Sequence, residues 1–210
     1  MKRRIINITA MLAVLVGVSL SAQAQKGAVK MGLYYDYSMP IGSFKSDYIS
    51  NGSPRGVGGE IMYNLSRQWG LGLNVAWQDY YQKYPRAIYS LDKNQDISAV
   101  VTNSVQSAPI LIKTVFSPLG NDRRTMIQPY ISAAAGLNLL TNSQYLGQFN
   151  SSDASARFMA QAGAGVQIPF SKLSNSAFFV GATYNYISYN KNGLNNFNTI
   201  DLQAGVRFPL

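Results

Sequence analysis

The last twelve residues of the chain, TIDLQAGVRFPL (199–210), alternate between two kinds of side chain. Apolar residues stand at even positions from Ile200 to Phe208, and polar residues or glycine stand at odd positions from Asp201 to Arg207. Successive side chains of a β-strand point to opposite faces, so this period of two predicts a strand with one apolar and one polar face. Because chain ends usually fray, we expect this terminal strand to be held by a neighbour.

The same alternation returns in seven further segments, which are separated by loops rich in Asn, Ser, Gly and Pro. The expected strands cover residues 29–38, 57–65, 71–78, 97–116, 127–140, 156–170 and 177–188, followed by the C-terminal stretch as the eighth. No helical spacing is sustained after residue 25. The connections after the second, fourth and sixth strands are shorter than most of the others, so we expect long and short connections to alternate.

The fourth expected strand, 97–116, is the least regular. Its parity changes near Ser107-Ala108-Pro109, and we interpret this as a β-bulge, since proline cannot donate to a strand ladder. The alternative is two separate strands. We reject it because the interval has no turn signature and a further strand would make the number of strands odd.

The N-terminus has the features of a secretory signal peptide. Three basic residues (2–4) precede a mostly apolar stretch (5–20), and Ala22-Gln23-Ala24 supplies the small residues of a cleavage site. We therefore expect residues 1–24 to be a signal peptide and residues 25–210 to form the mature domain. A membrane anchor fits less well, because the apolar stretch is short and contains Asn7.

The composition narrows the possible functions. The chain has no Cys and no His, so it forms no disulfide and lacks the commonest general base and metal ligand. Basic residues outnumber acidic ones by 18 to 9, but they are scattered and form no nucleic-acid patch. We expect no catalytic residue, no cofactor, no metal site and no nucleic-acid partner.

Aromatic residues on the apolar face gather at the ends of the expected strands. One end carries Tyr35, Tyr37, Trp77, Phe158, Tyr184 and Tyr186, and the other carries Tyr63, Phe116, Phe170, Phe178 and Phe208. Strand middles carry aliphatic residues such as Leu33 and Val75. Two aromatic girdles are typical of membrane-spanning barrels, whereas a soluble barrel gives no reason for such bands. We therefore expect the apolar face to contact lipid.

The opposite face carries charged residues, which we expect to form an ion-paired network in the lumen: Lys30, Asp36, Glu60, Lys113, Arg157, Asp201 and Arg207. An eight-stranded barrel is just wide enough for side chains to fill it, and a lone buried charge is costly. Glu60 is therefore expected to pair with Lys113, Arg157 or Arg207. Since lipid tolerates no open sheet edge, the last strand must pair with the first. The expected fold is all-β, an eight-stranded antiparallel up-and-down transmembrane β-barrel.

Five stretches carry a resemblance to a known family: SAPILIKTVF (107–116), YISAAAGLNLL (130–140), AGAGVQI (162–168), FFVGATYNYIS (178–188) and LQAGVRF (202–208). In order and spacing they resemble the small outer-membrane β-barrel proteins that include OmpA-like, OmpX-like and PorT-like barrels. The resemblance covers residues 25–210 and implies a location in the outer membrane and contact with its lipid. It also implies that the barrel-insertion machinery recognises the terminal strand, which has Phe208 near its end. The sequence departs from the OmpA proteins by stopping after the eighth expected strand, so we expect no peptidoglycan-binding domain.

We expect a monomeric, non-enzymatic outer-membrane protein that is structural or acts through its extracellular loops. One alternative is an enzyme that modifies outer-membrane lipid, for which the chain offers only the carboxylates of Asp36, Glu60 and Asp201. Another is an adhesin or ligand receptor that uses loops such as WQDYYQKYPRAIY (77–89), which is rich in Tyr. A wide diffusion pore is not expected, because eight strands leave no aqueous channel.

Overall fold

The computed structural model describes residues 28–91, 95–119, 126–146, 149–171, 176–191 and 194–210. The expected signal peptide, residues 1–24, lies outside the described residues. In chain order the elements are β1 (Val29–Ile41), α2 (Gly42–Asp47), β2 (Ser53–Asn64), β3 (Trp69–Lys83), β4 (Ala87–Leu91), β5 (Gln95–Ala99), β6 (Val101–Phe116), β7 (Gln128–Leu146), β8 (Phe149–Pro169), β9 (Ala177–Lys191) and β10 (Leu194–Pro209). No helix among the described residues is long and apolar enough to cross a membrane.

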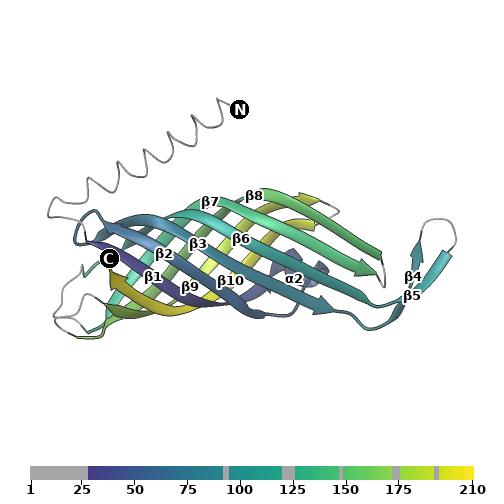
Figure 1. The fold of residues 1–210 in the computed structure, drawn as a ribbon, viewed down its shortest axis with the longest axis horizontal. Coiled ribbons are helices and arrows are strands. Elements are labelled where there is room, and N and C mark those ends of the chain that lie inside the picture. Colours follow the sequence, from purple (N-terminus) through teal and green to yellow (C-terminus); the bar gives the residue numbers. More distant parts are fainter. Residues whose placement is uncertain (1–27, 92–94, 120–125, 147–148, 172–175, 192–193) are drawn as a thin grey trace, which may run out of the picture.

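Eight of the strands form a closed barrel in the order β1-β10-β9-β8-β7-β6-β3-β2, and neighbouring strands are antiparallel (Figure 1). The last strand closes the barrel against the first, from Lys30 opposite Pro209 to Ile41 opposite Asn198. Beyond this ladder, the backbone N–H of Leu210 donates to the carbonyl of Val29 at 3.0 Å. The predicted eight-stranded antiparallel up-and-down barrel is confirmed.

The alternation of side chains follows the two faces of the barrel wall. On β3, Leu73 and Val75 point outward and are 49% and 46% exposed, whereas Asn74 between them points inward and is 1% exposed. The outward face therefore carries the apolar residues, as the period of two predicts.

The predicted bulge in the fourth strand is wrong. β6 pairs with β7 without a register shift, from Val101 opposite Leu146 to Phe116 opposite Ile131. The apparent change of parity arises because several apolar residues of β6, including Leu111 and Val115, face the lumen and are buried. Apolar residues therefore occupy both faces of this strand, which hides its alternation from a reading of the sequence.

The segment 97–116, expected as one strand, is divided at residue 100 into β5 and β6. β5 pairs only with β4, as a small hairpin outside the barrel, so the barrel still has eight strands. The expected long connections after the fifth and seventh strands also differ from the structure. β7 runs to Leu146 before β8 begins at Phe149, and β9 runs to Lys191 before β10 begins at Leu194. At these two places the residues expected in a long loop belong to extended strands.

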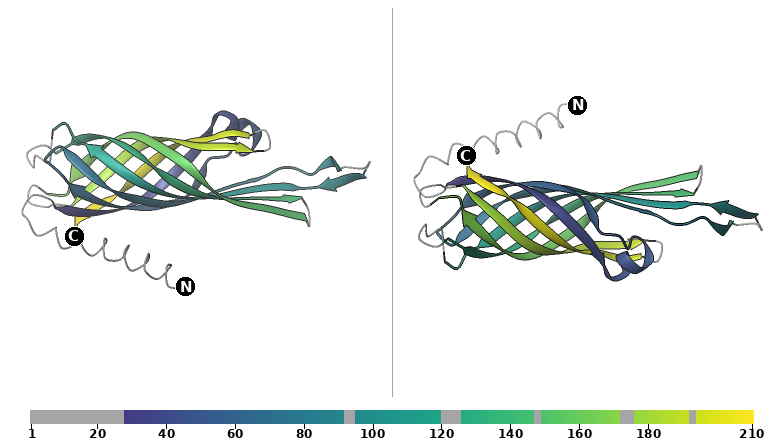
Figure 2. Two further views of the ribbon diagram at one scale, coloured as in Figure 1. Left: turned by 90° about the horizontal axis from the view of Figure 1, so that it is seen from above. Right: turned by 90° about the horizontal axis from the view of Figure 1, so that it is seen from below.

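The two ends of the barrel differ (Figure 2). We call the end that carries residues 28 and 210 the terminus end, and the end that carries α2 and the β4–β5 hairpin the distal end. At the distal end the β2–β3 ladder stops at Gly56 opposite Gln78, and the β8–β9 ladder stops at Met159 opposite Ile187. The ladders between β3, β6, β7 and β8 continue further, so these four strands project beyond the barrel as an open sheet.

Gly58 on β2 allows the ring of Tyr34 to lie close to the β2 backbone inside the barrel. A Cβ built there would lie 2.3 Å from Cζ of Tyr34, the residue opposite it on β1. We expect Gly58→Ala to displace the Tyr34 ring and lower the free energy of unfolding by about 1–3 kcal/mol. The matched control is Gly59→Ala on the outward face, where a Cβ finds its nearest atom at 3.4 Å. Urea unfolding in detergent would measure both, and equal losses would contradict the explanation.

Candidate functional sites in the lumen and at the distal end

A buried ion cluster lies in the lumen toward the terminus end. Glu60 of β2 accepts a bond from Lys113 Nζ of β6 at 2.8 Å and one from Arg207 Nε of β10 at 2.5 Å. All three residues are buried. Gly32 on β1 leaves the space for Glu60, since a Cβ there would lie 2.8 Å from its Cγ. Of the three bases considered for Glu60, the structure brings two to it.

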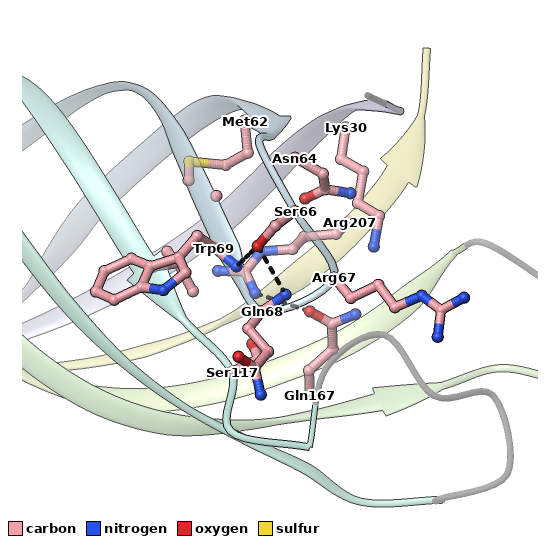
Figure 3. A pocket seen from close by; sticks show the side chains of 12 residues that line it. Lys30, Met62, Asn64, Ser66, Arg67, Gln68, Trp69, Ser117, Gln167 and Arg207 are labelled. Atoms are coloured by element: carbon pink, nitrogen blue, oxygen red, sulfur yellow. Dashed lines mark hydrogen bonds between the residues drawn. The ribbon is translucent and has the colours of Figure 1, made fainter. Parts of the chain in front are cut away.

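Arg207 links this ion cluster to the opening at the terminus end. Its Nη1 donates to Gln167 Oε1 at 3.0 Å, and its guanidinium lies 4.2 Å above the ring centroid of Phe179. Figure 3 shows the adjoining pocket, which Arg207, Lys30 and the turn after β2 line. In that turn the hydroxyl of Ser66 accepts hydrogen bonds from the backbone N–H groups of Gln68 and Trp69, which keeps the turn tight.

Three other predicted lumen charges, Asp36, Asp201 and Arg157, make their described side-chain contacts with residues other than Glu60. Asp36 and Asp201 lie nearer the middle of the lumen and interact with neutral donors. Asp201 accepts bonds from the Ser38 hydroxyl and from Asn185 Nδ2, and Asp36 accepts one from Gln203 Nε2 at 3.5 Å. Lys30 lines the pocket of Figure 3. Arg157 lies toward the distal end, where its guanidinium is 5.1 Å from the ring centroid of Tyr189.

An apolar plug, which the sequence analysis missed, closes the lumen at the distal end. Gly42, the first residue of the short helix α2, has a positive φ of 61°. Phe44 of α2 stacks on Phe197 of β10 at 4.3 Å between ring centroids and meets Tyr80 of β3 edge-on at 5.3 Å. The buried members of this plug are Phe44, Tyr48, Ile49, Tyr80, Val105, Leu111, Ala134, Leu140, Met159, Ile187, Tyr189 and Phe197. The expectation that polar and ion-paired side chains fill the lumen therefore holds for only part of it.

Polar bonds hold Tyr48 of the plug to the sheet that projects from the barrel. The backbone carbonyl of Tyr48 accepts a bond from the Tyr84 hydroxyl at 2.9 Å and one from Asn103 Nδ2 at 3.1 Å. Its own hydroxyl bonds to Asn142. Burial raises the pKa of the Tyr48 hydroxyl, so it stays a neutral donor. The signal in the sequence was the stretch IGSFKSDYI (41–49), where Phe44 and Tyr48 stand four residues apart, as on one face of a helix.

The eleven aromatic residues expected at the interfaces lie on the outward-facing positions of the wall. Eight are exposed: Tyr35, Tyr63, Trp77, Phe158, Phe170, Phe178, Tyr184 and Tyr186; three are half-buried: Tyr37, Phe116 and Phe208. Trp69 belongs with those at the terminus end, because it is exposed and packs 4.8 Å from Phe116 between ring centroids. Trp69 falls in the connection expected between the strands 57–65 and 71–78, although it shares the odd parity of Leu71 and Leu73.

The family model for the outer membrane protein beta-barrel domain matches residues 10–208. The chain belongs to this outer-membrane β-barrel family. No relative among the curated proteins matches the chain.

Several solved structures are similar to this outer-membrane barrel. Neisserial surface protein A is 17% identical with a TM-score of 0.49, and the match covers 88% of this chain and 97% of that one. OprG from Pseudomonas aeruginosa is 14% identical with a TM-score of 0.47, covering 88% and 96%. The N-terminal β-barrel domain of OprF from the same organism is 17% identical with a TM-score of 0.45, covering 87% and 100%.

Membership of the outer-membrane family gives a physical reason for the two faces of the wall. We call the exposed apolar side chains on the outward face of the barrel strands the apolar belt. Lipid is the surrounding that such a belt requires. The lumen is obstructed by the plug at the distal end and by the Glu60 cluster toward the terminus end.

Proposed function

We propose that this outer-membrane barrel is a non-enzymatic protein that binds an extracellular partner through the sheet projecting from its distal end. Outer-membrane barrels keep short turns on the periplasmic side and longer elements outside the cell. The distal end, with α2, the β4–β5 hairpin and the four projecting strands, is accordingly the extracellular end. The observation that carries the proposal is the open edge of β8.

On the side away from β7, the part of β8 that projects beyond the barrel has no neighbouring strand among the described residues. Residues 149–158 pair with β7 on one side, and the β8–β9 ladder begins only at Met159. This stretch, FNSSDASARF, contains no Pro that would prevent pairing, and its charged residues are Asp153 and Arg157. An extended peptide segment of a partner protein is the ligand that an open edge fits best, because main-chain bonds supply the affinity.

The buried position of the acidic residues supports a non-enzymatic role. Asp36, Glu60 and Asp201 are the carboxylates that a lipid-modifying enzyme would need from this chain, and each is at most 6% exposed inside the lumen. Lipid contacts the outward face, so the barrel wall separates it from these groups. Their bonds to neighbouring side chains fit a role in holding the barrel wall together.

A photo-activated cross-linker placed at Ala156 on the β8 edge tests the proposal in intact cells. Ala156 is exposed on the projecting part of β8, and the control position Ala133 is exposed on β7 within the apolar belt. We expect discrete cross-linked protein bands from Ala156 and lipid adducts alone from Ala133. The same result at both positions would contradict an interaction through this edge.

Three features of biogenesis belong to the same proposal. Residues 1–24 are a signal peptide removed on export, the insertion machinery recognises the terminal strand, and the barrel works as a monomer. The position of Phe208 supports the second of these, because it lies near the end of β10, the strand that closes the barrel. N-terminal sequencing of the mature protein would test the first, with Gln25 as the expected first residue.

A further inference from the structure

A small cavity lies in the middle of the lumen, between the distal plug and the Glu60 cluster. Acidic and amide side chains from four strands line it: Asp36 of β1, Gln78 of β3, Gln161 of β8 and Asp201 of β10. These residues are 5%, 6%, 7% and 6% exposed. The cavity has room for about one or two water-sized ligands.

Three buried oxygens on the cavity residues have no hydrogen-bond partner within the described part of the chain: Asp36 Oδ1, Gln78 Oε1 and Gln161 Oε1. The orientation of both amides follows from their other bonds. Gln78 Nε2 donates to the carbonyl of Ser53 at 3.0 Å, and Gln161 Nε2 donates to Asn185 Oδ1 at 2.8 Å. Reversing either amide would place oxygen against oxygen. All three groups without a partner are therefore acceptors.

The negative charge of the cavity, like its free acceptor oxygens, favours a positively charged ligand. The described partners of Asp36 and Asp201 are hydroxyl and amide groups, with no basic side chain among them. The nearest cluster of bases is engaged elsewhere, since Lys113 and Arg207 both bond to Glu60. Lys113 also acts on Asp36 electrostatically, but it is one charge already bonded to Glu60. Two further buried carboxylates are therefore costly, and a bound cation lowers that cost.

We propose that this cavity is a cation site that takes one hard divalent ion, with Ca²⁺ the best match. Its ligands would be carboxylate oxygens of Asp36 and Asp201 and the amide oxygens of Gln78 and Gln161. Ca²⁺ binds oxygen ligands of these kinds, whereas Mg²⁺ retains several waters for which the cavity has no room. Among the described residues no group of three or more His, Cys, Asp or Glu could hold a metal, so the amide oxygens are essential to the site.

The position of the cavity predicts slow exchange. The apolar plug lies on one side of it and the Glu60 cluster lies on the other. An ion would therefore enter while the barrel closes, and the folded barrel would then retain it. Retention of the ion would distinguish a site in the lumen from carboxylates on the surface, which exchange their ions freely.

Refolding in two conditions tests the inference. Denatured protein is refolded into detergent with CaCl₂ or with EGTA and NaCl, passed through a desalting column in EGTA, and analysed for metal by mass spectrometry. Folding is checked by heat-modifiable gel migration. We expect about one calcium per barrel after refolding with CaCl₂ and none after refolding with EGTA, together with a higher unfolding temperature of the loaded barrel.

Variants assign the ion to this cavity. Asp36→Asn and, separately, Gln161→Leu are expected to lose the retained calcium, whereas the control Asp79→Asn, which removes a carboxylate from the exposed Arg55 pair, retains it. Gln161→Leu keeps both carboxylates, so it serves if Asp36→Asn does not fold. Folded wild-type protein without calcium would overturn the inference, because water or protons would then satisfy the cavity. Unchanged calcium in a folded Asp36→Asn or Gln161→Leu barrel would also overturn it.

Discussion

Glu60→Gln is expected to lower the free energy of unfolding by about 3–5 kcal/mol, because it leaves two buried bases without their counter-charge. Lys113 and Arg207 both bond to this one carboxylate, and neither is more than 4% exposed. Glutamine keeps the shape and one acceptor oxygen, so the loss reports charge rather than packing. Urea titration of the refolded barrel in detergent, followed by tryptophan fluorescence, would measure it.

An exposed pair provides the control for Glu60. Arg55 and Asp79 form a salt bridge of 3.0 Å at the distal end, where the Arg55 side chain is 58% exposed. Water screens this pair, so Arg55→Gln is expected to cost no more than about 1 kcal/mol. A loss as large as that of Glu60→Gln would show that burial in the lumen does not increase the contribution of the ion cluster to stability.

Ile112→Arg is expected to destabilise the inserted barrel by about 2–4 kcal/mol, because it places a charge on the lipid-facing side of the wall. Ile112 is 63% exposed and lies on β6 four residues before Phe116 of the terminus-end girdle. Its inward neighbours on the same strand are Leu111 and Lys113, so a change at position 112 leaves the lumen untouched.

Ser104→Arg is the matched control for Ile112→Arg. Ser104 stands at an outward position of the same strand, but in the projecting sheet, opposite Tyr81 of β3 and Ser143 of β7. We expect a cost of about 0–1 kcal/mol there. Folding into lipid vesicles, followed by denaturant titration, would compare the two. If Ser104→Arg costs as much as Ile112→Arg, the apolar belt does not mark the membrane.

The fold could be predicted from the sequence because a period of two assigns each side chain to a face. Strict alternation, as from Ile200 to Phe208, identified the wall, and the rule against open edges in lipid identified the closing pair β1 and β10. The prediction failed where the alternation carries less information. On β6, Leu111 and Val115 put apolar residues on the lumen face, and this mixture imitated a bulge.

The lumen could be predicted only as a list of inward residues. Parity places Glu60, Asp36 and Asp201 inside, but their partners depend on the tilt and stagger of the strands, which period two does not contain. Arg157 shows the consequence, because it was a candidate partner for Glu60 and lies toward the distal end beside Tyr189. The plug was missed because its residues come from a short helix, from the two residues Tyr48 and Ile49 after it, and from six strands, and only the closed barrel brings them together.

The junction between β1 and β10 is a break in the covalent chain but not in the sheet. Met31 lies opposite Phe208, so the first and last described strands become neighbours, and this contact has nearly the largest sequence separation within residues 28–210. Such non-local pairing is slow, which leaves two strand edges open until the final segment arrives. The same proximity means that a short linker could join the two ends. A circular permutant opened between β7 and β8 would then test whether the order of strand delivery, rather than the closed sheet itself, governs assembly.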